Sequence, residues 1–171
     1  KDLIKFTIAG VGPFVIKPIT ALPSLTDAVF IDGFSQAGSN IYAVVVDGSL
    51  YSNSTGLLVA NNLSDVKITG LTFTKCTNAL VLSSNVFNCI VDSNKFTTNV
   101  NTGILLNAGV KNNQIVSNEF TGGFSAVNFS TGSTNNIFQR NKISNAKNGV
   151  LVEGGTNNTI KLNEITSSIQ N

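Results

Sequence analysis

The sequence has no His, no Trp and no Met, and it has only two Cys and three Pro among its 171 residues. Without His it cannot form a Ser-His-Asp triad, a His-ligated zinc hydrolase site or a blue-copper centre. Charged residues make up only 12% of the chain and the net charge of +2 is spread along it, so we predict no nucleic-acid partner. No apolar run approaches the roughly 18 residues of a transmembrane helix, so we predict no membrane insertion.

The residues that are abundant indicate a folded chain. Hydrophobic residues reach 42%, which together with the low charge argues against disorder, and Asn occurs 24 times. The length suits a single domain over residues 1–171, with irregular coils and loops in 1–55 and regular coils in 56–171. Because the sequence starts without Met or a signal segment, we expect a mature form or an expressed segment of a longer chain.

A repeat of about 23 residues organises the chain. One marker is apolar-x-x-Asn-x-apolar, and its last apolar residues are Phe73, Phe96, Phe120, Ile143 and Ile165, with Leu71 replacing Asn in the first copy. The other marker is a small residue followed by apolar-x-apolar, and it begins at Gly56, Ala79, Gly103, Ala126 and Gly149. Two markers that share one period over five copies indicate stacked repeats.

The alternation of apolar and polar residues inside each marker is the period of a β-strand, not of a helix. Asn, Gly, Ser and Thr separate the strands, which is typical of tight turns. A leucine-rich repeat has a similar length, but its Leu-x-x-Leu-x-Leu skeleton is absent. We therefore predict an all-β fold, a single right-handed parallel β-helix (β-solenoid) with three strands per coil, about 23 residues per coil and roughly six to seven coils.

Stacked coils would explain the excess of Asn. Asn94, Asn118, Asn141 and Asn163 would form one column, an Asn ladder at one corner, because each side-chain amide can both donate and accept. Asn also tolerates the left-handed backbone of a tight turn. The Asn-Asn pairs at 112–113, 135–136 and 157–158 would mark a second corner. N-glycosylation is the alternative for the triplets beginning at Asn53, Asn62, Asn128 and Asn157.

One outward column and the two cysteines can be placed on this repeat. The outward column is predicted to contain Thr72, Lys95, Glu119, Lys142 and Glu164, so that opposite charges alternate from coil to coil. Cys76 and Cys89 fall in separate columns, and Cys89 shares its column with Asn113 and Asn136. We predict two free, buried thiols and no disulfide.

The first third of the chain is less regular. Phe6–Ile8 and Val29–Ile31 lie 23 residues apart, so we expect them to be equivalent and the first coil to begin near Leu3. Pro13, Pro18 and Pro23 lie between them, which predicts an irregular connection covering the end of the first coil. Some cap is expected, because an open coil end exposes core and strand edges. A further strand is predicted over Ile41–Val46.

Several motifs of this region occur in order: Ile4-x-Phe6-x-Ile8, Gly10-x-Gly12-Pro13, Leu22-Pro23, Ile31-Asp32-Gly33-Phe34-Ser35-Gln36-x-Gly38, Val46-Asp47-Gly48-Ser49, Gly56-Leu57 and Ile68-Thr69-Gly70-Leu71. With the later Asn repeats they resemble the right-handed parallel β-helix repeat proteins of bacterial cell surfaces, whose coils are similar to those of pectate lyases. The resemblance implies an extracellular or cell-surface protein, often large and modular. It does not imply one activity, because this fold carries many.

The β-helix proteins that the chain resembles include polysaccharide lyases and hydrolases, which would need clustered carboxylates. No two acidic residues lie within four positions of each other, Asp92 would be alone in its column, and Asp32 and Asp47 each precede Gly, which favours a turn. The sole Arg, Arg140, would share a column with Ser93, Ser117 and Leu162, away from any acid. We therefore predict no enzyme activity, no catalytic, cofactor-binding or metal site, and no cofactor.

Three functions remain open from the sequence. The first is a non-catalytic extracellular structural or adhesive module, which could stack end to end into a surface fibre, because Asn171 lies inside an Asn-x-Ile coil without a visible cap. The others are a carbohydrate-binding module, and a polysaccharide-degrading β-helix whose catalytic part lies elsewhere. Ice binding would need regular Thr-x-Thr ranks, and only Thr72–Thr74 fits. The expected partners are a second copy through coil ends, other surface-protein modules or a polysaccharide, with residues 49–55 as the most plausible recognition loop.

Overall fold

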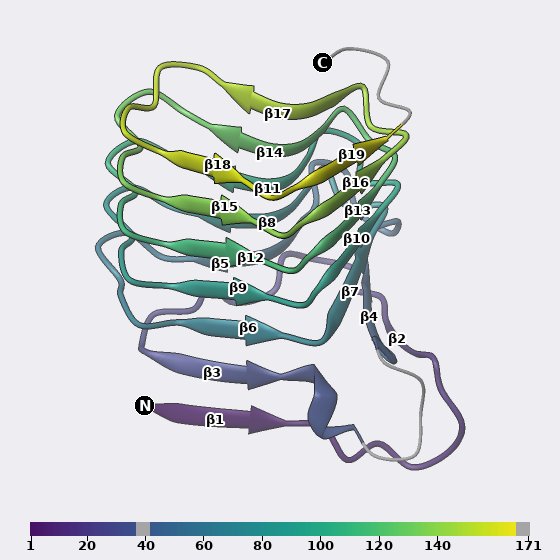
Figure 1. The fold of residues 1–171 in the computed structure, drawn as a ribbon. Helices are drawn as coiled ribbons and strands as arrows, with labels where there is room; N and C mark the ends of the chain where they lie inside the picture. Colours follow the sequence, from purple (N-terminus) through teal and green to yellow (C-terminus); the bar gives the residue numbers. More distant parts are fainter. Residues whose placement is uncertain (37–41, 167–171) are drawn as a thin grey trace.

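The computed structural model describes residues 1–36 and 42–166, which form one stack of short parallel strands in three sheets (Figure 1). Sheet A contains β1 (Asp2–Lys5), β3 (Val29–Asp32), β6 (Lys67–Thr69), β9 (Ile90–Asp92), β12 (Gln114–Val116), β15 (Ile137–Gln139) and β18 (Thr159–Lys161). Sheet B contains β2 (Phe14–Ile16), β4 (Val44–Asp47), β7 (Leu71–Thr74), β10 (Lys95–Thr97), β13 (Glu119–Thr121), β16 (Lys142–Ser144) and β19 (Glu164–Thr166). Sheet C contains β5 (Thr55–Val59), β8 (Asn78–Leu82), β11 (Thr102–Leu106), β14 (Ser125–Phe129) and β17 (Asn148–Val152).

Coils 2 to 6 contribute one strand to each sheet and coils 1 and 7 contribute to sheets A and B, so that the described chain winds through seven successive turns. Coils 2 to 6 begin with β3, β6, β9, β12 and β15; coil 1 contains β1 and β2, and coil 7 contains β18 and β19. The only helical element of the described residues is the one-turn 3₁₀ helix η1 (Gly33–Ser35). The predicted all-β parallel solenoid of about 23 residues per coil is therefore confirmed.

The strand register confirms both sequence markers. The five apolar residues of the first marker pair in one column of sheet B, from Phe73 to Ile165. Phe96 is 2% exposed and stacks between Phe73 and Phe120, with ring centroids 5.3 and 4.8 Å apart. Columns from sheets A and C complete one continuous core. Burial of these aligned apolar side chains is the main stabilising contribution, because no coil could bury its inward face alone.

The small residue of the second marker has a steric cause at Gly103. A Cβ atom there would lie 2.6 Å from the Ala126 carbonyl oxygen of the next coil and 2.8 Å from the Phe120 ring. A Cβ atom on Gly56 would likewise clash with the Ala79 carbonyl oxygen. Small residues at these positions let the chain turn into sheet C beside the stacked Phe rings.

The predicted Asn ladder lies between sheets A and B. The Asn118 side-chain oxygen accepts the backbone N–H of Asn94, 2.9 Å away, and the Asn118 amide nitrogen donates to the Val91 and Val116 carbonyls. Asn141 and Asn163 repeat the pattern, and Asn94 accepts from Leu71. Each amide thus satisfies backbone groups at a buried corner that strand pairing leaves free.

A second Asn ladder lies between sheets C and A, where the sequence predicted a corner but not its hydrogen bonds. The side-chain oxygens of Asn113, Asn136 and Asn158 accept the backbone N–H of Cys89, Asn113 and Asn136, respectively. The predicted ladder is therefore accompanied by a second one in the part of the chain that the structure describes. The side chains of Asn113 and Asn136 are fully buried, so these bonds are shielded from water.

The left-handed backbone lies one residue earlier than we expected for the first ladder. Ser93, Ser117, Arg140 and Leu162, which precede the ladder residues, have φ between 52° and 56°. At the second corner, Asn112, Asn135 and Asn157 do adopt the left-handed conformation, with φ of 55° to 58°. In each Asn-Asn pair the first residue therefore adopts the left-handed conformation of the turn, and the second forms the hydrogen bonds of the ladder.

The predicted equivalence of Phe6–Ile8 with Val29–Ile31 is wrong. In the structure Asp2 pairs with Val29 and Ile4 pairs with Ile31, so the offset is longer by four residues, although the coil does begin near Leu3. Phe6 and Ile8 leave the sheet because side chains of η1 and its C-cap hold them instead. The Ser35 hydroxyl accepts the N–H of Phe6, and the Gln36 amide bonds both the N–H and the carbonyl of Ile8.

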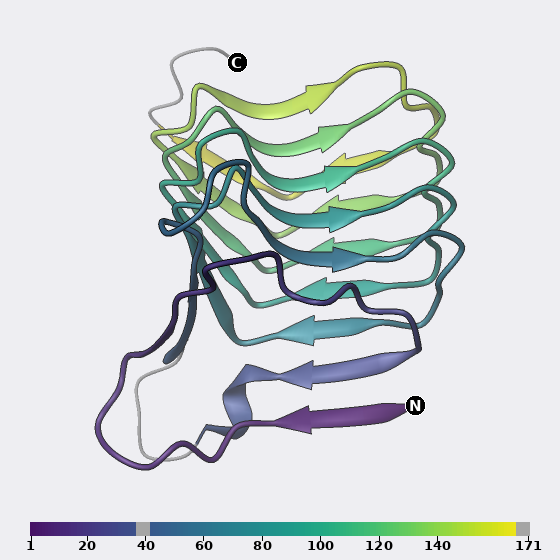
Figure 2. The ribbon, with the colours of Figure 1, turned by 180° about the vertical axis from the view of Figure 1, so that it is seen from behind.

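The proline-containing connection is more regular than predicted. It includes β2, which pairs with β4, and Leu25, which bridges to Val59 of β5. Figure 2 shows this part of the chain passing below β5 before it enters β3. The predicted strand over Ile41–Val46 is β4, from Val44; Ile41 lies outside the described residues.

Candidate functional site

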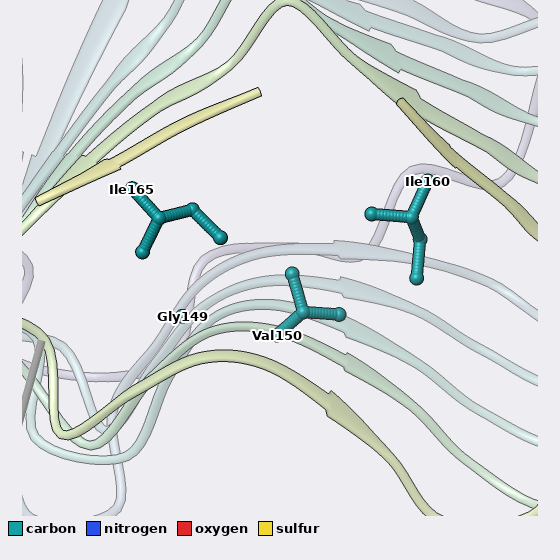
Figure 3. A pocket seen from close by; sticks show the side chains of 4 residues that line it. All are labelled: Gly149, Val150, Ile160 and Ile165. Atoms are coloured by element: carbon teal, nitrogen blue, oxygen red, sulfur yellow. The ribbon is translucent and has the colours of Figure 1, made fainter. Parts of the chain in front are cut away.

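The C-terminal face of the stack, formed by β17, β18 and β19, is an open apolar surface. These are the last strands of sheets C, A and B. Gly149, Val150, Ile160 and Ile165 line a cavity of about 410 Å³ there, with the side chains of the last three pointing into the space between the sheets (Figure 3). Ile160 and Ile165 are each 43% exposed, whereas their equivalents one coil earlier, Phe138 and Ile143, are fully buried.

Both Asn ladders are open at this face. Asn158 donates through its side chain to the Ser133 carbonyl, and Asn163 donates to the Phe138 carbonyl. In the described part of the chain, nothing accepts the backbone N–H of Asn158 or Asn163, although the equivalent groups one coil earlier are satisfied. Within the described residues, this face therefore has two backbone N–H groups without an acceptor, one at each ladder corner beside the apolar cavity.

The opposite, N-terminal face is formed by β1, β2 and the segment around Leu25. Its apolar cavity has a volume of about 220 Å³, and Ile4, Ile16, Pro23 and Leu25 are among its lining residues. Ile4 is 43% exposed and Ile16 38%. The expected cap is therefore absent from the described residues: the proline-containing connection lines the N-terminal cavity but leaves its apolar residues exposed. The connection supplies Leu22 and Pro23 to the rim.

The predicted alternation of charge holds in the outward column of sheet B. Lys95 pairs with Glu119, with 3.6 Å between Nζ and Oε2, and Lys142 pairs with Glu164, with 3.8 Å between Nζ and Oε1. Glu119 and Lys142 are neighbours in register. All four side chains are substantially exposed, so each pair contributes no more than about 1 kcal/mol and mainly disfavours a shifted register.

Asp92, Asp32, Asp47 and Arg140 lie where the sequence placed them. Asp92 lies between Thr69 and Val116 in register and accepts a hydrogen bond from the Ser93 hydroxyl. The Asp32 and Asp47 carboxylates accept the N–H groups of Phe34 and Ser49, as turn residues do. Over residues 1–36 and 42–166 there is no group of three His, Cys, Asp or Glu side chains able to hold a metal ion.

Asp47 has a larger role than the sequence indicated. Its side chain is only 6% exposed, and its carboxylate lies 3.7 Å from the amines of both Lys17 and Lys75. Burial by itself raises the pKa of Asp47, but hydrogen bonds from the Ser49 side chain and backbone, together with the two lysines, outweigh burial and lower it. Asp47 thus ties coils 1, 2 and 3 together through residues far apart in sequence.

We expect Asp47→Asn to lower the free energy of unfolding by about 1–3 kcal/mol at pH 7, because it removes a buried charge that two lysines and Ser49 stabilise. A folded pKa below that of the unfolded chain means that the stabilisation is present above the unfolded pKa of 3.8 and is lost as pH falls through the lower folded pKa. Urea unfolding at pH 7, 4 and 3 should therefore show a smaller acid-induced loss for the variant than for the parent chain.

The matched control for this prediction is Asp65→Asn, at an exposed carboxylate in a left-handed turn position that Asn accepts readily. It should leave the acid-induced loss almost unchanged. Equal pH profiles for Asp47→Asn and the parent chain would contradict the assigned role of Asp47.

The two cysteines are free and buried, as predicted. Burial raises the pKa of the Cys76 thiol to about 11, and burial also raises the pKa of Cys89. The Cys89 backbone N–H donates to the Asn113 side chain and so belongs to the second ladder, whereas the Cys76 N–H donates to the Asn99 side chain at the corner between sheets B and C.

Because the thiolate is the reactive form, neither cysteine should react with a thiol reagent such as Ellman's reagent in the folded protein at pH 8. Both should react fully after unfolding in guanidinium. Rapid titration of one thiol equivalent under native conditions would contradict the burial of these side chains.

An aromatic pair at the corner between sheets A and B was missed from the sequence. Phe34 is 45% exposed, and its ring centroid lies 6.0 Å from that of Tyr42, tilted by 48°. A Cβ atom on Gly70 would lie only 2.8 Å from the Phe34 ring, so this Gly permits the ring to pack on the corner. Burial raises the pKa of the Tyr42 hydroxyl, and the negative charges of Glu119 and Asp92 add to this effect. The signal in the sequence was Phe34 in an outward turn position.

The predicted recognition loop, residues 49–55, is partly held by its own contacts. The Tyr51 hydroxyl donates to the Thr55 carbonyl, and the buried Ser54 hydroxyl accepts the N–H of Thr77. Leu50 and Asn53 remain exposed. The loop therefore has an ordered base, and its role in recognition stays a prediction.

Comparison with known proteins gives one result. The family model described as right handed beta helix region matches residues 10–168. No curated protein and no solved structure gives a significant match. No helix within residues 1–36 and 42–166 has the length and apolar character needed to cross a membrane.

Proposed function

Since the chain belongs to the right-handed β-helix family, we propose that it is a non-catalytic structural module of an extracellular or cell-surface protein. The observation that carries this proposal is the use of polar side chains within the stack itself. Asn94, Asn118 and Asn141 form hydrogen bonds with the backbone of adjacent coils. The charged residues of sheet B form ion pairs with each other. A fold whose polar groups hold coils together is suited to maintaining a rigid shape.

The finer form of this proposal is an adhesive subunit that stacks end to end into a surface fibre. Two features support it: each end of the described stack exposes apolar residues of the core columns, and within the described residues β1 and β2 at one end and β17, β18 and β19 at the other each pair with one neighbouring strand. Such edge strands pair readily with another parallel strand. Negative-stain microscopy of the concentrated protein should show rods longer than one chain; single particles at every concentration would contradict the fibre.

The non-catalytic role is tested by incubating the protein with a panel of acidic and neutral polysaccharides, with and without Ca²⁺. Release of reducing ends would detect a hydrolase, and ultraviolet absorbance of unsaturated products would detect a lyase. We expect neither. Turnover that disappears in Asp92→Asn or Glu119→Gln, but not in the exposed control Asp65→Asn, would establish an enzyme and overturn the proposal.

A second candidate function is carbohydrate binding, favoured by the Phe34–Tyr42 pair, in which the Phe34 side chain is exposed and Tyr42 is under the electrostatic influence of Glu119 and Asp92. An aromatic face bordered by carboxylates offers both an apolar platform and hydrogen-bond acceptors for a sugar ring. The test is binding to a glycan array by the parent chain and by Phe34→Ala. Loss of binding in this variant, with binding retained in the matched control Phe124→Ala, would support the candidate; no binding by the parent chain would remove it.

A further inference from the structure

The N-terminal face carries a carboxylate at a position where the following coils have inward apolar residues. Asp2 pairs with Val29, and Val29 belongs to the column that continues through Val66 and Cys89 to Asn113, Asn136 and Asn158. Val29 and Val66 are buried, whereas Asp2 is exposed. An acidic residue therefore stands at the exposed end of the column that forms the second Asn ladder.

Each Asn of the second ladder donates hydrogen bonds to a side-chain oxygen in the following coil. The backbone N–H and the side-chain amide of Asn113 both donate to the Asn136 side-chain oxygen, at 3.0 and 2.9 Å. Asn136 makes the same two bonds to Asn158, both at 2.9 Å. Asn158 has no such acceptor among the described residues. The missing partner is a side-chain oxygen in the same column of one further coil, and a carboxylate meets that requirement.

We propose that the C-terminal face binds the N-terminal face of a second copy of this chain, with Asp2 of the second copy capping the ladder at Asn158. The inference rests on the proposed structural function and names the partner and the register of its end-to-end contact. In this register β1 follows β18, β2 follows β19 and the Leu25 segment follows β17, so the three sheets continue in parallel. The interface is head to tail, and repetition produces a filament.

The apolar columns match in this register. Because Ile4 pairs with Ile31, and that column ends at Ile160, Ile4 of the second copy comes to rest on Ile160. By the same reasoning Ile16 follows Ile165 in sheet B, and Leu25 follows Val152 in sheet C. Five of these six side chains are exposed and Leu25 is half-buried, so stacking would bury apolar surface at both faces.

Two positions weaken the contact and help to test it. Lys5 of the second copy would follow Lys161 in the outward column of sheet A, placing like charges side by side. Phe14 would follow Asn163, so the first ladder receives no side-chain acceptor. The contact should therefore be of moderate strength and sensitive to the charge at residue 161.

The test is sedimentation velocity of the parent chain and three variants over a range of concentrations, at low and high salt. The parent chain should associate reversibly. Asp2→Leu should weaken association by about tenfold or more, because it removes the proposed acceptor for Asn158, whereas Asp2→Asn should retain it. Lys161→Glu should strengthen association several-fold at low ionic strength, and this gain should shrink in about 0.5 M salt.

Residues 2, 5 and 161 are exposed, so the variants should fold, and unfolding curves check this. A chain that stays monomeric at every concentration would overturn the inference, as would equal association by Asp2→Leu and the parent chain. Neither result would contradict the proposed non-catalytic role, which is tested separately by the turnover assay. Conversely, polysaccharide turnover would remove the proposed function even if Asp2-dependent association were observed.

Discussion

Replacement of Phe120 by Ala should lower the free energy of unfolding by about 3–5 kcal/mol. Phe120 is 2% exposed and lies between two other rings, with centroids 4.8 Å from Phe96 and 6.0 Å from Phe138. The substitution removes the transfer free energy of the ring and leaves a cavity in the middle of the column. Both neighbours are held by their own coils, so the stack cannot close over the gap. Urea or guanidinium denaturation measures the change.

The matched control is Phe124→Ala, in the same coil. Phe124 is 39% exposed and makes a cation–π contact, with Lys147 Nζ 4.8 Å from its ring centroid, so its loss should cost only about 1 kcal/mol. Lys142→Ala, in the outward column, should cost less than about 1 kcal/mol. Similar losses for Phe120→Ala and Phe124→Ala would mean that the Phe column does not carry the core.

Replacement of Asn118 by Ala should also be severe, at about 3 kcal/mol or more. The change removes the acceptor for the Asn94 backbone N–H and the donors to the Val91 and Val116 carbonyls, all at 2.9 Å. It also breaks the ladder bond to Asn141, 3.1 Å away. Each buried polar group left without a partner costs about 1–3 kcal/mol, and the site is 1% exposed, so bulk water does not replace the amide.

Asn101→Ala provides the comparison for the ladder. Asn101 is exposed, and its side chain donates only to the Asn78 side chain at 3.1 Å, so we expect a loss below about 1 kcal/mol. Amide hydrogen exchange gives a second measurement: the N–H of Asn94 should lose protection in Asn118→Ala but not in Asn101→Ala. Unchanged protection at Asn94 in both variants would contradict the ladder bond.

The regular part of the fold could be predicted because each coil repeats the same physical problem. Inward residues such as Phe96 and Phe120 must be apolar at one spacing, and Asn94 and Asn118 must recur where strand pairing leaves backbone groups unsatisfied. Two periodic signals therefore identified the columns and their register. The first ladder was assigned correctly for the same reason, although its left-handed residue proved to be the one before Asn.

The irregular part could not be predicted in this way. The spacing of Phe6 and Val29 suggested a false equivalence, because the true register depends on Ser35 and Gln36 holding the strand end from another coil. The Phe34–Tyr42 pair escaped notice since the ring of Phe34 packs against Gly70, which is distant in sequence. Asp47 was correctly assigned to a turn, but its two lysine partners come from coils 1 and 3.

The class of fold, the length of each coil and the residues that face the core could be deduced from the repeat alone, because they follow from local periodicity and from the need to bury apolar faces. Which polar groups remain unsatisfied depends on how the coils stack in three dimensions. Stacking leaves the backbone N–H groups of Asn158 and Asn163 without an acceptor in the described residues, and it leaves Ile160 and Ile165 exposed. It also places Asp2 at the opposite end of the column that contains Asn158. Whether a donor has an acceptor depends on the neighbouring coil, so a single repeat of the sequence does not reveal which donors are unsatisfied.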